Sequence, residues 1–149
     1  MNKTRMYLDN CCYNRPYNDQ SLKAISLEAE AKLYIQDNIR NGKLELAWSF
    51  MLDFENSANP YEERKESIEE WKALSMENIK AIEEVKDLAK RLETAYNIKP
   101  KDALHLACAI ETKSQYFLTT DRILLKKASQ LKEITVINPV DFIMIWEEK

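Results

Sequence analysis

The chain has 149 residues, of which 45% are hydrophobic and 32% charged, and its net charge is −3. These values fit a single folded domain over residues 1–149 and are too apolar for a disordered chain. The single glycine and four prolines argue against a turn-rich β-sandwich or barrel and exclude a glycine-rich phosphate-binding loop.

Charge is unevenly distributed along the sequence. Residues 62–93 hold ten acids and seven bases, so this segment accounts for the whole net charge. A polyanion could still bind elsewhere, where the basic side chains include Arg15, Lys99, Lys101, Arg122, Lys126 and Lys127. No apolar run reaches the ~18 residues of a membrane span, and the N-terminus lacks a signal-peptide layout. We therefore expect a cytoplasmic protein that does not contact membranes.

The first quarter of the chain predicts a strand and a long helix. Residues 5–8 are apolar and β-prone, and a polar loop with two breakers follows them. Ser21 is a candidate N-cap for a helix over residues 22–40. Gly42 ends that helix as a C-terminal glycine does.

A second strand at 44–49 leads into a helix at 50–59. Asn59 and Pro60 then predict the start of another helix, with one apolar face made by Ile68, Trp71 and Leu74. The clearest amphipathic stripe follows, with apolar residues three or four positions apart from Ile79 to Tyr96.

The last third of the chain alternates helices with continuous apolar strands. Pro100 opens a helix that is apolar nearly all round, which predicts burial. Residues 115–120 and 134–137 are typical of strands inside a parallel sheet, and the helix between them fits a right-handed crossover. Asn138 and Pro139 cap a final helix. This order predicts an α/β/α sandwich around a parallel sheet of four or five strands.

Acidic residues follow the predicted strands. Because ligand sites of open parallel sheets form at the carboxyl ends of strands, we expect Asp9, Glu55, Asp102 and Asp121 to converge there. Each has a structural alternative: Asp121 as an N-cap, Asp102 as a partner of a helix dipole, and Glu55 on a solvated helix face. Asp9 is hardest to explain in this way, since a buried acid without a partner is costly.

Four crowded carboxylates repel one another unless a cation offsets their charge. Oxygen ligands select Mg²⁺ or Mn²⁺ over zinc, and such a site suits phosphodiester hydrolysis. The only histidine, His105, lies three residues after Asp102, and a core position is favoured over a place beside the acids. Cys11, Cys12 and Cys108 have no metal-ligand spacing and are interpreted as small packing residues.

Several blocks of the sequence resemble, in order, the motifs of PIN-domain nucleases, including the VapC-like ribonucleases. They are YLDNCC, SFMLDFEN, KPKDALHLACAI, YFLTTDRILLKKA and INPVDFI, and the similarity spans residues 6–145. The resemblance implies a Mg²⁺- or Mn²⁺-dependent nuclease of single-stranded RNA, often the toxin of a toxin–antitoxin pair and often a homodimer. Many relatives carry a polar Asn or Ser where this chain has Cys11.

Matching positions carry the family's acidic quartet onto Asp9, Glu55, Asp102 and Asp121, as catalytic residues and metal ligands. Asn10 and Thr119 would be supporting hydrogen bonders. Arg15, Lys101 and Arg122 are candidate RNA contacts. The region 60–96 would be a helical clip that contacts a second subunit or an antitoxin.

Two alternatives to the nuclease stay open. One is a PIN-like RNA-binding protein without turnover. The other is a partner-binding regulator that uses the acidic helices, in which a surface Trp71 would matter more than any acid.

Overall fold

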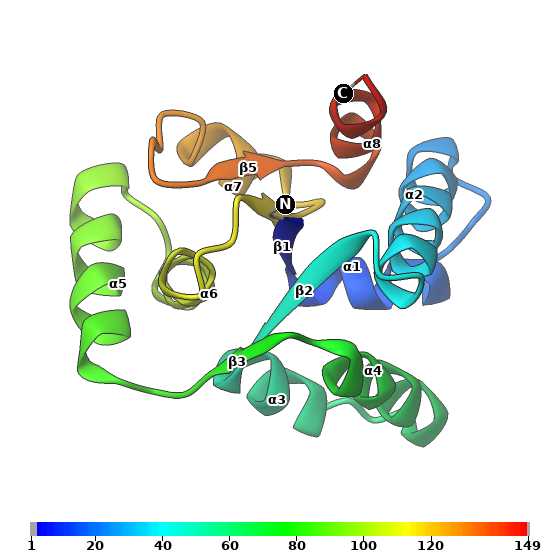
Figure 1. Cartoon of the computed structure of the whole chain (residues 1–149), viewed down its shortest axis with the longest axis horizontal. Helices are drawn as coiled ribbons and strands as arrows, with labels where there is room; N and C mark the ends of the chain where they lie inside the picture. Colours follow the sequence, from blue (N-terminus) through cyan, green and yellow to red (C-terminus); the bar gives the residue numbers. More distant parts are fainter. Residues whose placement is uncertain (1–2, 149) are drawn as a thin grey trace.

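The computed structural model describes residues 3–148. Strands and helices alternate along most of it (Figure 1). In chain order the elements are β1 (Thr4–Leu8), α1 (Asn10–Asn14), a 3₁₀ turn (Arg15–Tyr17), α2 (Lys23–Arg40), β2 (Leu44–Ser49), α3 (Phe50–Ser57), α4 (Glu62–Leu74), β3 (Glu77–Ile79), α5 (Glu83–Tyr96), α6 (Pro100–Glu111), β4 (Tyr116–Leu118), α7 (Arg122–Lys127), β5 (Thr135–Ile137) and α8 (Pro139–Glu147).

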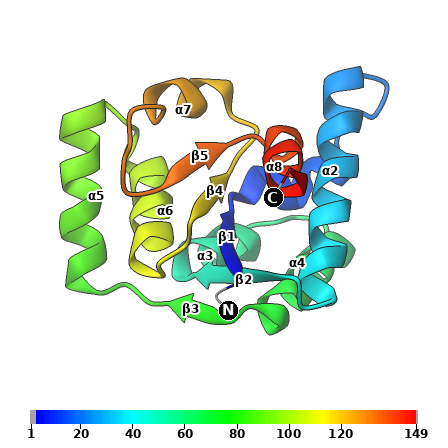
Figure 2. The same ribbon diagram turned by 45° about the horizontal axis from the view of Figure 1, so that its top comes forward.

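The strands form one parallel five-stranded sheet in the order β3-β2-β1-β4-β5. Helices α5 and α6 lie on one side of it, and α2 and α8 lie on the other (Figures 1 and 2). The predicted α/β/α sandwich is therefore confirmed. The connections leave β1 and β4 in opposite directions, so the crevice between their carboxyl ends is where an open α/β sheet binds ligands.

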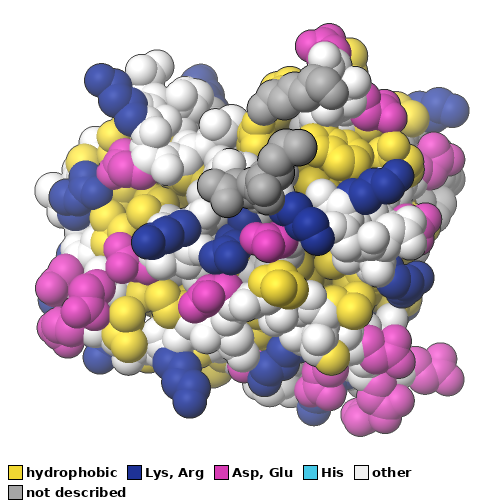
Figure 3. All heavy atoms as spheres, viewed as in Figure 1, with side chains coloured by type: hydrophobic (Ala, Val, Ile, Leu, Met, Phe, Trp, Pro, Cys, Tyr) yellow, Lys and Arg dark blue, Asp and Glu magenta, His cyan; other side chains and the backbone are white. Residues whose placement is uncertain are grey.

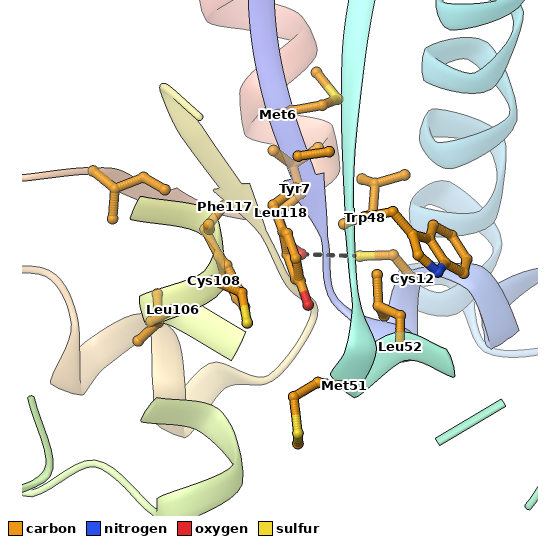
Figure 4. Packing of buried hydrophobic residues seen from close by; sticks show 14 of the residues in the cluster. Met6, Tyr7, Cys12, Trp48, Met51, Leu52, Leu106, Cys108, Phe117 and Leu118 are labelled. Carbon is orange, nitrogen blue, oxygen red and sulfur yellow. Dashed lines mark hydrogen bonds between the residues drawn. The ribbon is translucent and has the colours of Figure 1, made fainter. Parts of the chain in front are cut away.

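Aromatic packing fixes the centre of the sheet next to that crevice. Tyr7 of β1 is fully buried and stacks on Phe117 of β4, with ring centroids 5.4 Å apart. Trp48 of β2 is fully buried on the other side of Tyr7 (Figure 4). Cys12 is also fully buried, and its thiol donates to the carbonyl of Leu118 at 3.4 Å (Figure 4). Burial of this kind stabilises by roughly 1.5–3 kcal/mol for each large apolar side chain.

The prediction of a helix that includes Ile79 and Ile82 was wrong. Glu77–Ile79 is the edge strand β3, whose approach to β2 begins with the hydrogen bond from the Met76 amide to the Leu46 carbonyl at 2.8 Å. The helix α5 starts only at Glu83. Three strand residues are too few to show a period of two, so the pattern of the following helix masked them.

Two predicted helix starts were displaced. Ser21 does not cap α2, because the helix begins one residue later and its N-cap position is Leu22. The Ser21 amide donates to the Asp19 carboxylate at 3.0 Å in a turn that precedes the helix. Asn59 does not cap α4 either. Its carboxamide accepts from the Tyr61 amide at 3.1 Å, which forms a turn and delays the helix to Glu62.

The polar loop predicted over residues 14–20 is helical in its first part. The short helix α1 ends at Asn14, and the 3₁₀ turn Arg15–Tyr17 follows it. Asp9 begins α1 by accepting a hydrogen bond from the Asn10 amide. The short helix α1 matters because it places Cys11 next to Asp9 and Thr119, at the ends of β1 and β4.

Two of the three residues in the predicted apolar face of α4 pack on their own chain, and the third, Leu74, is exposed. Ile68 and Trp71 are 2% and 6% exposed, and the guanidinium of Arg40 lies 5.0 Å from the Trp71 ring centroid. The proposal of a surface Trp71 was therefore wrong. Acidic side chains gather instead on the outer faces of α4 and α5 (Figure 3). No helix among the described residues is both long and apolar enough to cross a membrane.

Candidate active site

Asp9 is fixed at the mouth of the central crevice. It follows β1, is 9% exposed, and accepts from the Asn10 amide through Oδ1 at 2.8 Å. The hydroxyl of Thr119, which follows β4, donates to Oδ2 at 2.9 Å. Each carboxylate oxygen has a second lone pair. Asp9 is thus oriented by both strands while keeping oxygen capacity for a ligand.

Cys11 packs against the hydrophobic core, as expected of a small packing residue, and it also belongs to the wall of this site. Its thiol lies 3.5 Å from Asp9 Oδ2 and 3.4 Å from Thr119 Oγ1, and the Thr120 amide donates to its sulfur at 3.4 Å. Asp9 caps the helix that contains Cys11, so the first turn brings the thiol back onto the carboxylate. The position of Cys11, two residues after Asp9, was the feature of the sequence that could have predicted this contact. Cys12 is likewise a packing residue, as expected.

Glu55 is held by a buried chain of hydrogen bonds. His105 Nε2 lies 2.6 Å from Glu55 Oε1, and His105 Nδ1 lies 2.6 Å from the Tyr7 hydroxyl. The Tyr7 hydroxyl also lies 2.5 Å from Ser49 Oγ. His105 is a buried side chain on α6, as expected, but it also contacts an acid of the site, which the sequence interpretation did not favour. The contact joins side chains of α6 and α3 that are 50 positions apart in the sequence, and no local pattern predicts it.

The charge on His105 follows from its neighbours. Burial opposes the protonated ring, but the hydrogen bond with Glu55 and the nearby carboxylates of Asp9 and Asp102 raise the pKa of His105 above its ordinary value. An imidazolium donates from both ring nitrogens. It would therefore donate to Glu55 and to the Tyr7 oxygen, which leaves the Tyr7 proton for Ser49.

Asp102 and Asp121 line a small cavity together. Asp102 lies in the first turn of α6 and Asp121 directly precedes α7, and both border this cavity together with Lys99 and Lys127. Burial, followed by the charges of Asp9 and Asp121, raises the pKa of Asp102. The mutual repulsion expected from the sequence is thus present.

The proposed N-cap alternative for Asp121 is realised in the structure. Its Oδ1 accepts from the amides of Ile123 and Leu124 at 2.9 and 3.2 Å. Capping uses one carboxylate oxygen and leaves Oδ2 available, so it does not exclude a ligand role. The Asp121 amide is itself bound by Thr119 Oγ1 at 3.1 Å, which ties it to the hydroxyl that also orients Asp9.

The donor atoms fit a divalent cation. Ligand atoms of Asp9, Glu55 and His105 all lie within 4.8 Å of one another. Both nitrogens of His105 already have hydrogen-bond partners, so the carboxylate oxygens are the atoms free to coordinate. Oxygen donors suit Mg²⁺ or Mn²⁺, and a cation would relieve the repulsion among the acids.

The remaining predicted site residues differ in availability. Arg15 is occupied, because its Nε donates to Glu28 at 2.9 Å and its Nη1 to Asn18 at 3.0 Å. Lys101 and Arg122 are exposed at the starts of α6 and α7. Asn10 supports Asp9 through its backbone amide, not through its side chain.

Comparison with known families agrees with this geometry. The model of the PIN domain family matches residues 8–130, so the chain belongs to the PIN domain family. The resemblance expected from the sequence motifs is confirmed. The matched range contains all four acids and His105.

Among solved structures, the fold is similar to that of VapBC2 from Rickettsia felis, crystallised with a DNA fragment from the promoter. The TM-score is 0.56, and the match covers 91% of this chain and 98% of that chain. The two sequences are 14% identical, so this likeness shows the shared fold alone. No curated protein matches the chain.

Proposed function

We propose that the chain is a Mg²⁺- or Mn²⁺-dependent endoribonuclease that hydrolyses phosphodiester bonds of single-stranded RNA. The observation that carries the proposal is the group of donor atoms around Asp9, in which ligand atoms of Asp9, Glu55 and His105 lie within 4.8 Å of one another. Asp102 and Asp121 border one small cavity, and the negative charge of Asp9 contributes to the raised pKa of Asp102. Membership in the PIN domain family supports the same reaction class.

The chemistry divides between the cation and the side chains. Bound Mg²⁺ or Mn²⁺ would supply the charge that activates a water and stabilises the phosphate and the leaving oxygen. Thr119 and the Asn10 amide hold the Asp9 carboxylate in one orientation. His105 does the same for Glu55 and leaves Oε2 without a hydrogen bond among the described residues. Such fixed side chains avoid reorganisation during the reaction.

RNA would approach over the starts of α6 and α7. Lys101 and Arg122 are exposed there, close in sequence to Asp102 and Asp121. We assign to them contacts with the phosphate backbone, which depend on salt and not on base sequence. Because Arg15 is already paired with Glu28, it would bind RNA only after that ion pair opens.

We also propose a cytoplasmic toxin that pairs with an antitoxin protein and forms a homodimer, with α4 and α5 contributing contacts. The fold shared with VapBC2 supports the antitoxin. Co-expression with a neighbouring small gene, followed by co-purification and light scattering, tests both associations. A monomer that captures no such partner would contradict them.

The nuclease itself is tested by incubating the protein with matched single-stranded RNA, duplex RNA and single-stranded DNA in Mn²⁺ and in EDTA. Cleavage of single-stranded RNA in Mn²⁺ alone supports the proposal. Retention of RNA in EDTA, without cleavage of any substrate in Mn²⁺, supports instead an RNA-binding protein without turnover.

A further inference from the structure

A cleft rich in asparagines, which we call the asparagine cleft, opens beside Glu55. It lies among α1, the end of α3 and the start of α4, and its volume is about 250 Å³. Half of the residues that line it are asparagines: Asn10, Asn14, Asn18, Asn56 and Asn59. Sites for drug-sized ligands are typically ~300–1,000 Å³. This cleft therefore suits a smaller group.

Two of these asparagines build the cleft wall. Asn56 donates to the Lys65 carbonyl at 3.0 Å and accepts from Asn59 at 3.4 Å. Asn59 also accepts from the Tyr61 amide. Their carboxamides hold the loop between α3 and α4 against the start of α4, so this wall is fixed before any ligand arrives.

The opposite wall keeps unused hydrogen-bonding capacity. Asn10 and Asn14 lie one turn apart on α1, and Asn14 Nδ2 donates to the Asn10 carbonyl at 3.0 Å. The side-chain Oδ1 of Asn10 is buried and has no hydrogen-bond partner within the described chain. A buried acceptor without a partner costs about 1–3 kcal/mol, so its persistence needs an explanation. Because this oxygen is shielded from solvent, a ligand in the cleft would accept Asn10 as a partner only after the side chain, which lines the cleft, turns toward it.

A cation over an aromatic ring forms the rim of the cleft. The Arg64 guanidinium lies 4.0 Å from the Tyr61 ring centroid and 4.8 Å from that of Tyr17. Within residues 3–148 no carboxylate forms a salt bridge with Arg64, unlike Arg15. Its N–H donors are therefore not committed to a carboxylate and are available to an anionic or polar group at the rim.

We propose that this asparagine cleft binds one nucleobase of single-stranded RNA, next to the phosphate positioned at Glu55, and so sets the cleavage sequence. Carboxamides pair with base edges because they offer a donor and an acceptor side by side. Bases of single strands can turn outward and stack on aromatic rings or on arginine. The small volume, the carboxamides that line the cleft and the aromatic and cationic rim at Tyr61 and Arg64 each match one of these needs.

This inference rests on the proposed function, and the test separates the two. The variants are Asn14→Ala and Arg64→Met, neither of which changes an acid of the site. Asn78→Ala, an exposed asparagine on β3, and Arg40→Met, an arginine that also lies over an aromatic ring, are matched controls. Thermal unfolding of every variant verifies folding.

The measurement is the cleavage rate in Mn²⁺ on a panel of RNAs that differ by one base at each position around the cut, together with fluorescence anisotropy of the same RNAs in EDTA. We expect wild type to prefer one base at one position next to the cut. Asn14→Ala and Arg64→Met should reduce that preference by about tenfold, the size of one base contact, while both controls keep it.

Each other outcome decides between the claims. If the cleft variants cleave with the wild-type base preference, the cleft proposal is wrong and the nuclease stands. If wild type cleaves nothing but binds RNA in EDTA with a base preference that only the cleft variants lose, the cleft stands and the nuclease fails. If wild type neither cleaves nor binds RNA, the cleft proposal is wrong. It is also wrong if the cleft variants lose only antitoxin binding.

Discussion

His105 Nε2 lies 2.6 Å from Glu55 Oε1, and this contact joins α6 to α3 beneath the carboxyl ends of the strands. The exposed fractions of the two side chains are 2% and 21%. The histidine is therefore enclosed while the acid reaches the surface. This arrangement makes His105 a positioning residue for Glu55.

We expect His105→Leu to lower kcat for RNA cleavage by about 10- to 100-fold, the usual cost of removing a partner that orients a ligand. His105→Gln, which can still donate toward Glu55, should recover part of the loss. The readouts are kcat and the Mn²⁺ concentration for half-maximal rate. Equal rates for wild type and His105→Leu would contradict the positioning role.

Thr119 offers a conservative test of Asp9. In Thr119→Val the side chain keeps its shape but loses the hydroxyl that donates to Asp9 Oδ2 and accepts from the Asp121 amide. We expect a loss of roughly tenfold in cleavage, since one charge-assisted hydrogen bond is worth about 1.5–3 kcal/mol and part of that is compensated by water. Thr119→Ser, which keeps the hydroxyl, is the control and should stay near wild type.

Removal of the metal should reveal repulsion among the acids. The pKa of Asp102 is raised by burial and then by Asp9 and Asp121, so its charged form weakens the folded state at neutral pH, above the usual titration range of the group. Asp102→Asn should raise the free energy of unfolding of the metal-free protein by roughly 0.5 kcal/mol, a small value because Asp102 is half-exposed and screened.

Mn²⁺ should reverse that order of stability. Added cation stabilises wild type because it binds the folded state alone, and Asp102→Asn should gain less from it. Thermal unfolding with and without Mn²⁺ measures both effects. An equal Mn²⁺-dependent shift in melting temperature for the two proteins would contradict a cation at this site.

Lys32 provides a pH-dependent prediction outside the site. Its ammonium is buried 5.5 Å from the Tyr13 ring centroid and 5.9 Å from that of Trp71, and burial lowers its pKa to about 8. The unfolded chain keeps this proton up to about pH 10.5. Wild-type stability should therefore rise, relative to Lys32→Met, as pH increases from 8 toward 10.5.

At pH 7 the variant should be the more stable protein. A pKa shift of this size destabilises the folded state by roughly 3 kcal/mol. The two cation–π contacts of Lys32 offset about 1–2 kcal/mol of that destabilisation. We expect Lys32→Met to gain about 1 kcal/mol in urea unfolding at pH 7. If the difference in free energy of unfolding between Lys32→Met and wild type did not decrease with rising pH, the pH dependence could not be assigned to titration of Lys32.

The sequence predicted the parts of the site that depend on strand ends. Asp9 and Asp121 follow continuous apolar runs, and a parallel sheet brings the ends of such runs to one edge whatever the lengths of the connections. β3 was missed because three residues carry too little pattern, and its pairing with β2 is a tertiary contact.

The contacts between helices were beyond sequence reasoning. The pairing of His105 with Glu55 joins residues 50 positions apart on two helices, and the relative placement of those helices comes from tertiary packing, not from local periodicity. The asparagine cleft likewise combines α1, which was not predicted as a helix, with the turn before α4. Neither of these contacts produces a regular spacing of residues from which it could be predicted in a single sequence.

The central claim is that Asp9, at the end of β1, and Asp102, in the first turn of α6, help to hold the cation with which the protein cleaves RNA. The most direct test compares single-turnover cleavage of one single-stranded RNA by wild type, Asp9→Asn and Asp102→Asn at saturating Mn²⁺. Each substitution keeps the shape of the side chain and removes one charge. We predict that both variants cleave at least about 100-fold more slowly than wild type, consistent with the loss of roughly 3 kcal/mol of transition-state stabilisation; cleavage at the wild-type rate would contradict the claim.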